Sequence, residues 1–149
     1  MENLISKFKH RYPFRVRTFH VDRQNVVHNI WYFYFFEEAR VEYVRELGMQ
    51  IDEQTFVSHD KFFVVKNSCE YAAPAYYNEE LILFTRIAYV KNSSISFEHL
   101  AVQPERGLVA RADHILVSVD ERTNLPRRVP EDLRGMIARY EGVNAVFIE

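Results

Sequence analysis

A small group of polar residues near the start of the chain has side chains suited to chemistry. Asp22 opens a polar loop, Asp22-Arg23-Gln24-Asn25, and His28 and Asn29 follow shortly after it. A carboxylate can activate a nucleophile or act as one, and an imidazole can carry a proton near neutral pH. The apolar run that follows Asn29 predicts a helix, whose first N–H groups and positive end could stabilise negative charge on a carbonyl oxygen. Together these groups suit hydrolysis of an activated acyl group.

Each of these residues also has an ordinary structural interpretation. An aspartate after a strand commonly closes a turn, and a loop histidine is commonly a packed polar group. Capping of the helix is the favoured role for Asn29, although its amide could also hydrogen-bond an acyl carbonyl or a water. From the residues alone, Asp22 is more often a turn residue than a catalytic one.

The element that must position this group is a long helix predicted from Ile30 to Leu47. No proline or glycine interrupts it, and Gly48 can supply the left-handed residue that ends it. Apolar residues recur at helical spacing, namely Phe35, Phe36, Ala39, Tyr43 and Leu47. The first two turns, Ile30 to Phe36, are apolar or aromatic on every side, which predicts burial all round.

Strand patterns occupy most of the remaining chain. They cover Phe14 to Val21, Phe62 to Tyr71, Leu81 to Lys91, Ser94 to Gln103 and Leu108 to Asp120. Short turns join the later strands, which favours antiparallel neighbours. A short helix is predicted from Pro130, and residues 143–149 form an apolar tail expected to dock on the body.

These elements predict an α+β fold with one long central helix and a curved antiparallel sheet of about five strands. A sheet that curls round a single helix is the hotdog fold. One helix covers only one face of the sheet, so the outer face and the edge strands remain available to a second copy. Self-association as a homodimer or homotetramer is therefore expected.

Composition predicts one globular domain over residues 1–149, because 48% of the residues are hydrophobic and the length can bury a core. The net charge of −2 gives no general attraction to nucleic acid or to an anionic membrane, so neither partner is expected. Cys69 is the single cysteine and no secretory or membrane-spanning segment is evident, which favours the cytoplasm. His99 and His114 could approach each other across neighbouring strands, but two ligands do not make a zinc site, and neither a metal nor a cofactor is expected.

Two segments carry a resemblance to a known family. The first runs from Val21 through Asp22, Val26-Val27 and His28-Asn29 to Tyr32 and Glu37-Glu38-Ala39-Arg40; the second is Tyr71-Ala72-Ala73-Pro74-Ala75. In order and spacing they resemble the 4-hydroxybenzoyl-CoA thioesterase-like branch of hotdog proteins. Two positions depart from the family pattern: Asn25 replaces a loop glycine, and Asn29 stands where many relatives have histidine. Asparagine tolerates left-handed backbone, so the first change is acceptable.

The resemblance implies an acyl-CoA thioesterase with Asp22 as general base or nucleophile and with Asn29 and His28 as further catalytic candidates. Tyr32 and Val27 would bind substrate, although an aromatic on a buried helix is more often core. Coenzyme A carries phosphates, so basic side chains should lie near the pocket mouth, with Arg86, Lys91 and Arg111 as candidates. The aromatic residues of the helix could line an acyl slot, and most of them are expected in the core.

Two other functions remain open at this point. A hotdog hydratase or dehydratase would usually pair a catalytic histidine with an acid, a context that Asp22 lacks. A non-catalytic acyl-CoA-binding domain is compatible with the loss of the loop glycine and the histidine. Release of free thiol would distinguish the thioesterase from both.

Overall fold

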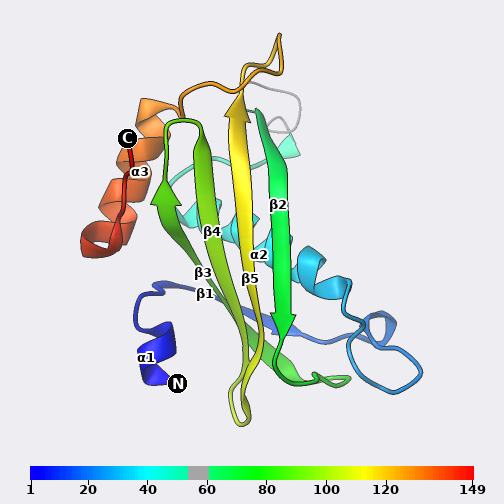
Figure 1. Ribbon diagram of the computed structural model, residues 1–149. Coiled ribbons are helices and arrows are strands. Elements are labelled where there is room, and N and C mark those ends of the chain that lie inside the picture. Colours follow the sequence, from blue (N-terminus) through cyan, green and yellow to red (C-terminus); the bar gives the residue numbers. More distant parts are fainter. Residues whose placement is uncertain (54–60) are drawn as a thin grey trace.

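The computed structural model describes residues 1–53 and 61–149 and confirms the predicted architecture (Figure 1). Five antiparallel strands form one sheet in the order β1-β3-β4-β5-β2. The strands are β1 (His10–Arg15), β2 (Lys61–Tyr71), β3 (Glu80–Val90), β4 (Ser94–Gln103) and β5 (Gly107–Val119). The helices are α1 (Glu2–Ile5), η1 (Thr18–His20), α2 (Trp31–Glu46), α3 (Glu131–Glu141) and η3 (Gly142–Asn144). No helix within these residues is long and apolar enough to cross a lipid bilayer.

The long helix α2 packs on the sheet through one face. Its buried residues recur at helical spacing, and they are Tyr32, Phe35, Phe36, Ala39 and Tyr43. Small residues on the sheet beneath the first four of these, Ala101, Ala110 and Ala112, belong to the same buried cluster and allow the helix to lie close. Figure 1 shows α2 behind the sheet, crossing the long strands. This packing fixes the start of α2 relative to β2 and β5.

The first strand differs from the sequence-based expectation. It runs from His10 to Arg15 and not from Phe14 to Val21, and the chain then turns into η1. The reason is local, because the His20 ring accepts the N–H of Arg17 at 2.8 Å and thereby stabilises a 3₁₀ turn. β1 is an edge strand, where the missing N–H of a proline is tolerated. The early end of β1 leaves residues 16–30 to form the approach to α2.

The ends of the two main helices largely agree with the sequence. Gly48 follows α2 with a φ of +111°, the left-handed backbone that was predicted to end the helix. α3 begins at Glu131 with Pro130 as its N-cap residue. The tail docks as expected, since the N–H of Ile148 donates to the carbonyl oxygen of Val90 at 2.8 Å. α3 and the tail therefore cover the end of β3 that β1 does not reach.

Candidate functional site

The Asp22 loop is a small closed turn on the approach to α2. Val21 bridges Val27, and the N–H of Asp22 donates to the carbonyl oxygen of Val26 at 2.9 Å. Oδ1 of Asp22 accepts the N–H of Gln24 at 2.8 Å, so the side chain also stabilises its own turn. Asn25 has a φ of +62°, which fits the expectation that it replaces a glycine in left-handed backbone. Asp22 is exposed, and its second oxygen accepts no hydrogen bond from the residues described.

This loop is fixed to the body of the protein on its return side. The N–H of Val27 donates to the carbonyl oxygen of Ala75 at 2.9 Å, and that of His28 donates to the carbonyl oxygen of His20 at 2.9 Å. The Val27 side chain is buried in the main core. Val27, a candidate for substrate binding, thus anchors the loop from inside the protein.

Two side chains hold the peptide that precedes α2. Nδ1 of His28 accepts the N–H of Ile30 at 3.3 Å, and the hydroxyl of Tyr71 donates to the carbonyl oxygen of Asn29 at 3.0 Å. Because a backbone N–H can only donate, Nδ1 of His28 is the acceptor, and a neutral ring carries its proton on Nε2. The exposed His28 ring therefore presents a donor to solvent.

The prediction that the Asn29 side chain caps α2 is wrong. Ile30 occupies the N-cap position, and no side chain accepts a hydrogen bond there as a cap. The reason is that the first N–H groups bond within a preceding turn, with Trp31 donating to the carbonyl oxygen of His28 at 3.0 Å. The N–H of Asn29 itself donates to no residue that the structure describes. A free N–H therefore stands at the positive end of α2.

Tyr32 lies in the core, the ordinary interpretation of an aromatic on this helix. Only 3% of it is exposed, and its ring contacts Tyr71 and Phe35 with centroids 5.4 and 5.6 Å away. Burial raises the pKa of its phenol well above the usual value. Tyr32 thus packs the start of α2 against the core.

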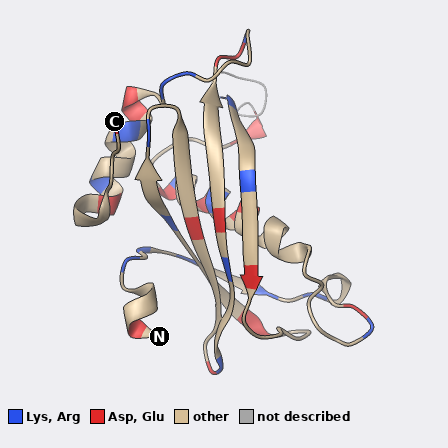
Figure 2. Ribbon diagram, viewed as in Figure 1, with Lys and Arg blue, Asp and Glu red and all other residues tan. Residues whose placement is uncertain are grey.

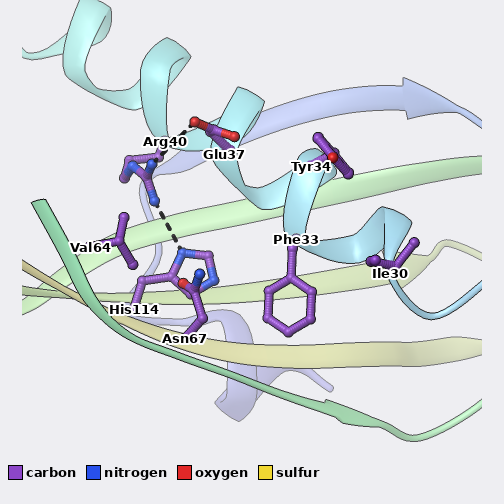
Figure 3. A pocket seen from close by; sticks show the side chains of 8 residues that line it. All are labelled: Ile30, Phe33, Tyr34, Glu37, Arg40, Val64, Asn67 and His114. Carbon is purple, nitrogen blue, oxygen red and sulfur yellow. Dashed lines mark hydrogen bonds and ion pairs between the residues drawn. The ribbon is translucent and has the colours of Figure 1, made fainter.

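A second stripe of α2 lines a cavity of about 250 Å³ against the edge of the sheet (Figure 3). The stripe comprises Ile30, Phe33, Tyr34, Glu37 and Arg40, and the opposite wall comprises Val64 and Asn67 of β2 and His114 of β5. The prediction that the first two turns are buried all round is wrong, because Ile30 is 53% and Tyr34 58% exposed. Only one face of α2 meets the sheet, so these aromatics stay open. Asp22 is not among the lining residues.

The inner end of this cavity is polar. Arg40 donates to Nδ1 of His114 at 3.3 Å, and His114 lies against His99 with ring centroids 4.7 Å apart, as expected from neighbouring strands. Burial, and then the Arg40 charge, lower the pKa of His114 to about 4. Both imidazoles are therefore neutral at pH 7, since burial lowers the pKa of His99 as well.

Sequence reasoning did not pick out Arg40 and Asn67 as site residues. Arg40 could have been found from the sequence, because positions 30, 33, 34, 37 and 40 follow helical spacing and so lie on one side of the helix. Asn67 could not be found in this way, because a bulge between Val64 and Lys66 changes the side-chain alternation of β2.

The three predicted coenzyme A contacts lie apart from this site within one chain. Arg86 and Arg111 both pair with Glu98, at 2.6 and 3.1 Å. Since His99 faces α2, its neighbour Glu98 points to the opposite face of the sheet. Figure 2 shows that the central strands carry acidic and basic residues. Lys91 lies beyond the end of β3, with its ammonium 5.5 Å from the ring centre of Tyr89. The structure does not bring these residues to the start of α2.

Comparison with known proteins assigns the chain to a family. The model of the thioesterase-like superfamily matches residues 16–137. The acyl-CoA thioester hydrolase YbgC of Escherichia coli O6:H1 is 32% identical over 124 residues, which cover 83% of this chain and 91% of that protein. The chain therefore belongs to the thioesterase-like superfamily, and the predicted enzyme class, a thioester hydrolase, is confirmed.

Solved structures agree with the fold. The PA5185 protein from Pseudomonas aeruginosa strain PAO1 superposes with a TM-score of 0.77 at 26% identity, covering 90% of this chain and 92% of that one. A thioesterase from Thermus thermophilus, crystallised with coenzyme A and Zn, superposes with a TM-score of 0.79 at 24% identity, covering 91% and 96%. The predicted hotdog architecture is thus confirmed.

Proposed function

We propose that the protein hydrolyses an acyl-coenzyme A thioester to a free acid and coenzyme A. The proposal is supported by the family, by the similarity to YbgC and by the superposition on a thioesterase crystallised with coenzyme A. The observation that carries it is that an exposed Asp22 carboxylate and a backbone N–H of Asn29 with no acceptor among the described residues both lie on the approach to one helix. Acyl transfer to water needs one group that activates the nucleophile and one that stabilises the oxyanion, and these two groups can supply them.

In this proposal the free oxygen of Asp22 acts on the thioester in one of two ways. As a general base it takes a proton from water, whose oxygen then attacks the carbonyl carbon. As a nucleophile it attacks directly, forms an acyl anhydride and is regenerated by water. In either case the bond from carbon to sulfur breaks and the thiolate leaves with the electron pair. Label found in the Asp22 carboxylate after a single turnover in heavy-oxygen water would identify the nucleophilic route, because the general-base route places the label only in the product acid.

The start of α2 supplies the remaining groups. The N–H of Asn29 donates to the developing oxyanion, and the positive end of the helix adds to its stabilisation. The side-chain amide of Asn29 hydrogen-bonds the substrate carbonyl oxygen or the attacking water. His28, whose Nε2 carries the proton when Nδ1 accepts from Ile30, donates that proton to the departing thiolate.

A second copy of the chain completes the site. β2 is an edge strand with three exposed apolar residues in a row, Phe63, Val64 and Val65, at 45%, 44% and 60% exposure. Unpaired strand edges of this kind bind another strand. Antiparallel pairing of two β2 strands would cover the open stripe of α2 and form a wall opposite Asp22, which faces solvent in one chain. We therefore place the substrate between two protomers of a homodimer or homotetramer, in the cytoplasm.

Replacement of the carboxylate tests the mechanism. Asp22→Asn should lower the rate of thiol release from a responsive acyl-CoA by about a hundredfold to ten-thousandfold, the usual range for loss of a general base. Asp120→Asn is a matched control, since Oδ1 of Asp120 also accepts backbone N–H groups in a turn, from Arg122 at 2.8 Å and Thr123 at 3.0 Å. Equal turnover of Asp22→Asn and wild type would remove Asp22 from the mechanism.

The same assay separates the rival functions. A hydratase or dehydratase changes the enoyl absorbance without releasing thiol, and a binding domain does neither. A panel of short, medium and aromatic acyl-CoA substrates, followed by thiol detection, therefore decides among the three functions.

Self-association is tested at the strand edge. Val65→Lys should convert the oligomer to a monomer in light scattering and abolish thiol release, because a charge at an edge opposes strand pairing. Leu125→Lys is the control, since Leu125 is equally exposed at 64% but lies between β5 and α3. An active monomer would show that one chain suffices.

A further inference from the structure

A guanidinium group with few partners closes the inner end of the cavity beside α2. The Arg40 side chain is only 12% exposed. It makes one hydrogen bond, at 3.3 Å to Nδ1 of His114, and a loose ion pair at 3.8 Å with Glu37, whose side chain is 61% exposed. A guanidinium has five N–H donors, so most of those on Arg40 have no acceptor among the described residues.

These partners compensate the largely buried charge only in part, because the remaining neighbour of the guanidinium is the ring of Phe97, whose centre is 6.0 Å away. His114 is neutral at pH 7 and contributes no negative charge, while Glu37 approaches only to 3.8 Å and is screened by water because its side chain is 61% exposed. A buried charge is costly unless hydrogen bonds and an opposite charge surround it. An anionic oxygen inside the cavity would supply both, and it would compete with Glu37 for the same guanidinium.

The rest of the cavity suits the body of an acyl group. Figure 3 shows Ile30, Phe33 and Tyr34 at one end, toward the start of α2, with Arg40 and Asn67 at the other. Ile30 directly follows Asn29, the proposed oxyanion donor. Arg40 lies ten positions after Ile30, which is about 15 Å along a helix at about 1.5 Å per residue. An acyl group held at Asn29 could therefore extend past the aromatic wall to the guanidinium.

The amide of Asn67 adds a second polar contact at the same end. Asn67 faces His114 across the β2–β5 pair, and its side chain has no hydrogen-bond partner among the residues described. Its NH₂ group could donate beside Arg40 to the same oxygen acceptor. The inner end thus offers hydrogen-bond donors from a helix and from a strand.

We propose that this cavity selects acyl groups whose far end carries a carboxylate, which binds to Arg40 and Asn67. The inference rests on the proposed hydrolysis of acyl-CoA and names its substrate class. Arg40 is then a specificity-determining residue that contacts the substrate away from the reacting carbonyl.

Matched substrates test this assignment. Suberoyl-CoA and octanoyl-CoA have acyl chains of equal carbon number and differ in the terminal carboxylate, and sebacoyl-CoA and decanoyl-CoA repeat the comparison with longer chains. Wild type should have the higher kcat/KM for the dicarboxylic member of at least one pair. Arg40→Gln should lower that kcat/KM by about tenfold to a hundredfold, the usual effect of losing a hydrogen bond to a charged group, with about twofold change or less for the neutral member.

Two further variants on α2 act as controls. Arg45→Gln removes an exposed arginine that pairs with Glu42, and the preference should not change. Glu37→Gln removes the competing acid, and the preference for the dicarboxylic substrate should rise. Turnover of the neutral substrate by each variant reports that it is folded.

Several outcomes overturn the inference. These are a wild-type preference for the neutral member of both pairs, or an Arg40→Gln variant that loses both members of a pair equally, as expected if Arg40 only anchors α2 to the sheet. Thiol release from none of the four substrates and from no member of the wider acyl-CoA panel overturns the proposed function instead. Binding of the longer pair then decides the inference, measured through quenching of Trp31 fluorescence. If the ratio of the Kd values for sebacoyl-CoA and decanoyl-CoA is the same in wild type and in Arg40→Gln, the inference is refuted.

Discussion

The two faces of α2 carry similar residues and have different fates. Phe36, on the face toward the sheet, is fully buried and its ring stacks on His99 with centroids 5.0 Å apart. Tyr34, two residues earlier, is 58% exposed beside the cavity. Composition cannot distinguish these faces, since both are aromatic. The difference arises because a single sheet can cover only one side of a helix.

This contrast separates stability from function along one element. Residues of the packed face remove apolar area from water in each chain and so stabilise the fold. Residues of the open face gain such burial only when a ligand or a second protomer covers them. Exposed aromatic surface next to a polar cavity is costly for a lone chain and useful for binding.

The largest predicted difference in stability is between truncations of one aromatic residue on each face of α2. Phe36→Ala should lower the free energy of unfolding by about 3–5 kcal/mol, because it leaves a cavity in the core. Tyr34→Ala should change it by about 0.5 kcal/mol or less under conditions where the protein is monomeric. Urea unfolding at one protein concentration measures both. Equal losses would show that the two faces do not differ as described.

The stability of the protein should depend on pH through His114, which lies at the boundary between the two faces. His114 contacts both Phe33 and Phe36, and its folded-state pKa of about 4 lies below the ordinary value of 6.5. Between these values the unfolded chain binds more protons, so stability is complete above about pH 6.5 and declines as the pH falls toward 4. The decline should be on the order of 3 kcal/mol.

His114→Gln should flatten this profile in thermal unfolding experiments. Part of the slope should remain in that variant, because burial also lowers the pKa values of His99, His10 and His20. Identical profiles for variant and wild type between pH 4 and 6.5 would exclude His114 as a source of the acid sensitivity.

The sequence predicted the fold well because its signals are periodic and local. The limits of the later strands, the end of α2 at Gly48 and the start of α3 after Pro130 agree with turn and cap residues that can be identified individually. The first strand was misplaced because hydrogen bonding by the His20 side chain, which no pattern reports, overrides the strand tendency of residues 16–21.

The site was less predictable. Asp22 and the start of α2 could be located by resemblance, and Asn25 by its tolerance of left-handed backbone. The direction of the Asp22 carboxylate, the role of Tyr71 and the inward position of Arg40 depend on contacts between residues far apart in the chain. Spacing along one element cannot give such contacts.

A smaller effect is expected at the far end of the packed face. The Tyr43 hydroxyl donates to Oε1 of the buried Glu141 at 2.5 Å, and the same oxygen accepts the N–H of Ile87 at 3.0 Å. Tyr43→Phe should lower the free energy of unfolding by about 1.5–3 kcal/mol, because a buried carboxylate loses a donor. Tyr140→Phe is the control, since the Tyr140 hydroxyl bonds Glu46 near the surface and should cost about 1 kcal/mol or less. Chemical denaturation compares them, and equal costs would contradict a special role for the buried pair.

The smallest effect should appear at the start of α2, next to the proposed reaction site. Tyr71→Phe removes the hydrogen bond to the carbonyl oxygen of Asn29 and keeps the ring that packs on Tyr32. The carbonyl oxygen of Asn29 then loses its shorter hydrogen bond and keeps the one from the N–H of Tyr32 at 3.3 Å. The peptide next to the proposed oxyanion donor is held less firmly, so kcat should fall about threefold to tenfold with KM nearly unchanged, as expected for about 1 kcal/mol. Tyr76→Phe, whose ring lies under the guanidinium of Arg106, should leave both constants unchanged. A Tyr71→Phe variant with altered thermal stability and wild-type kcat would assign Tyr71 to the scaffold, because a residue that positions a catalytic peptide must affect the turnover step.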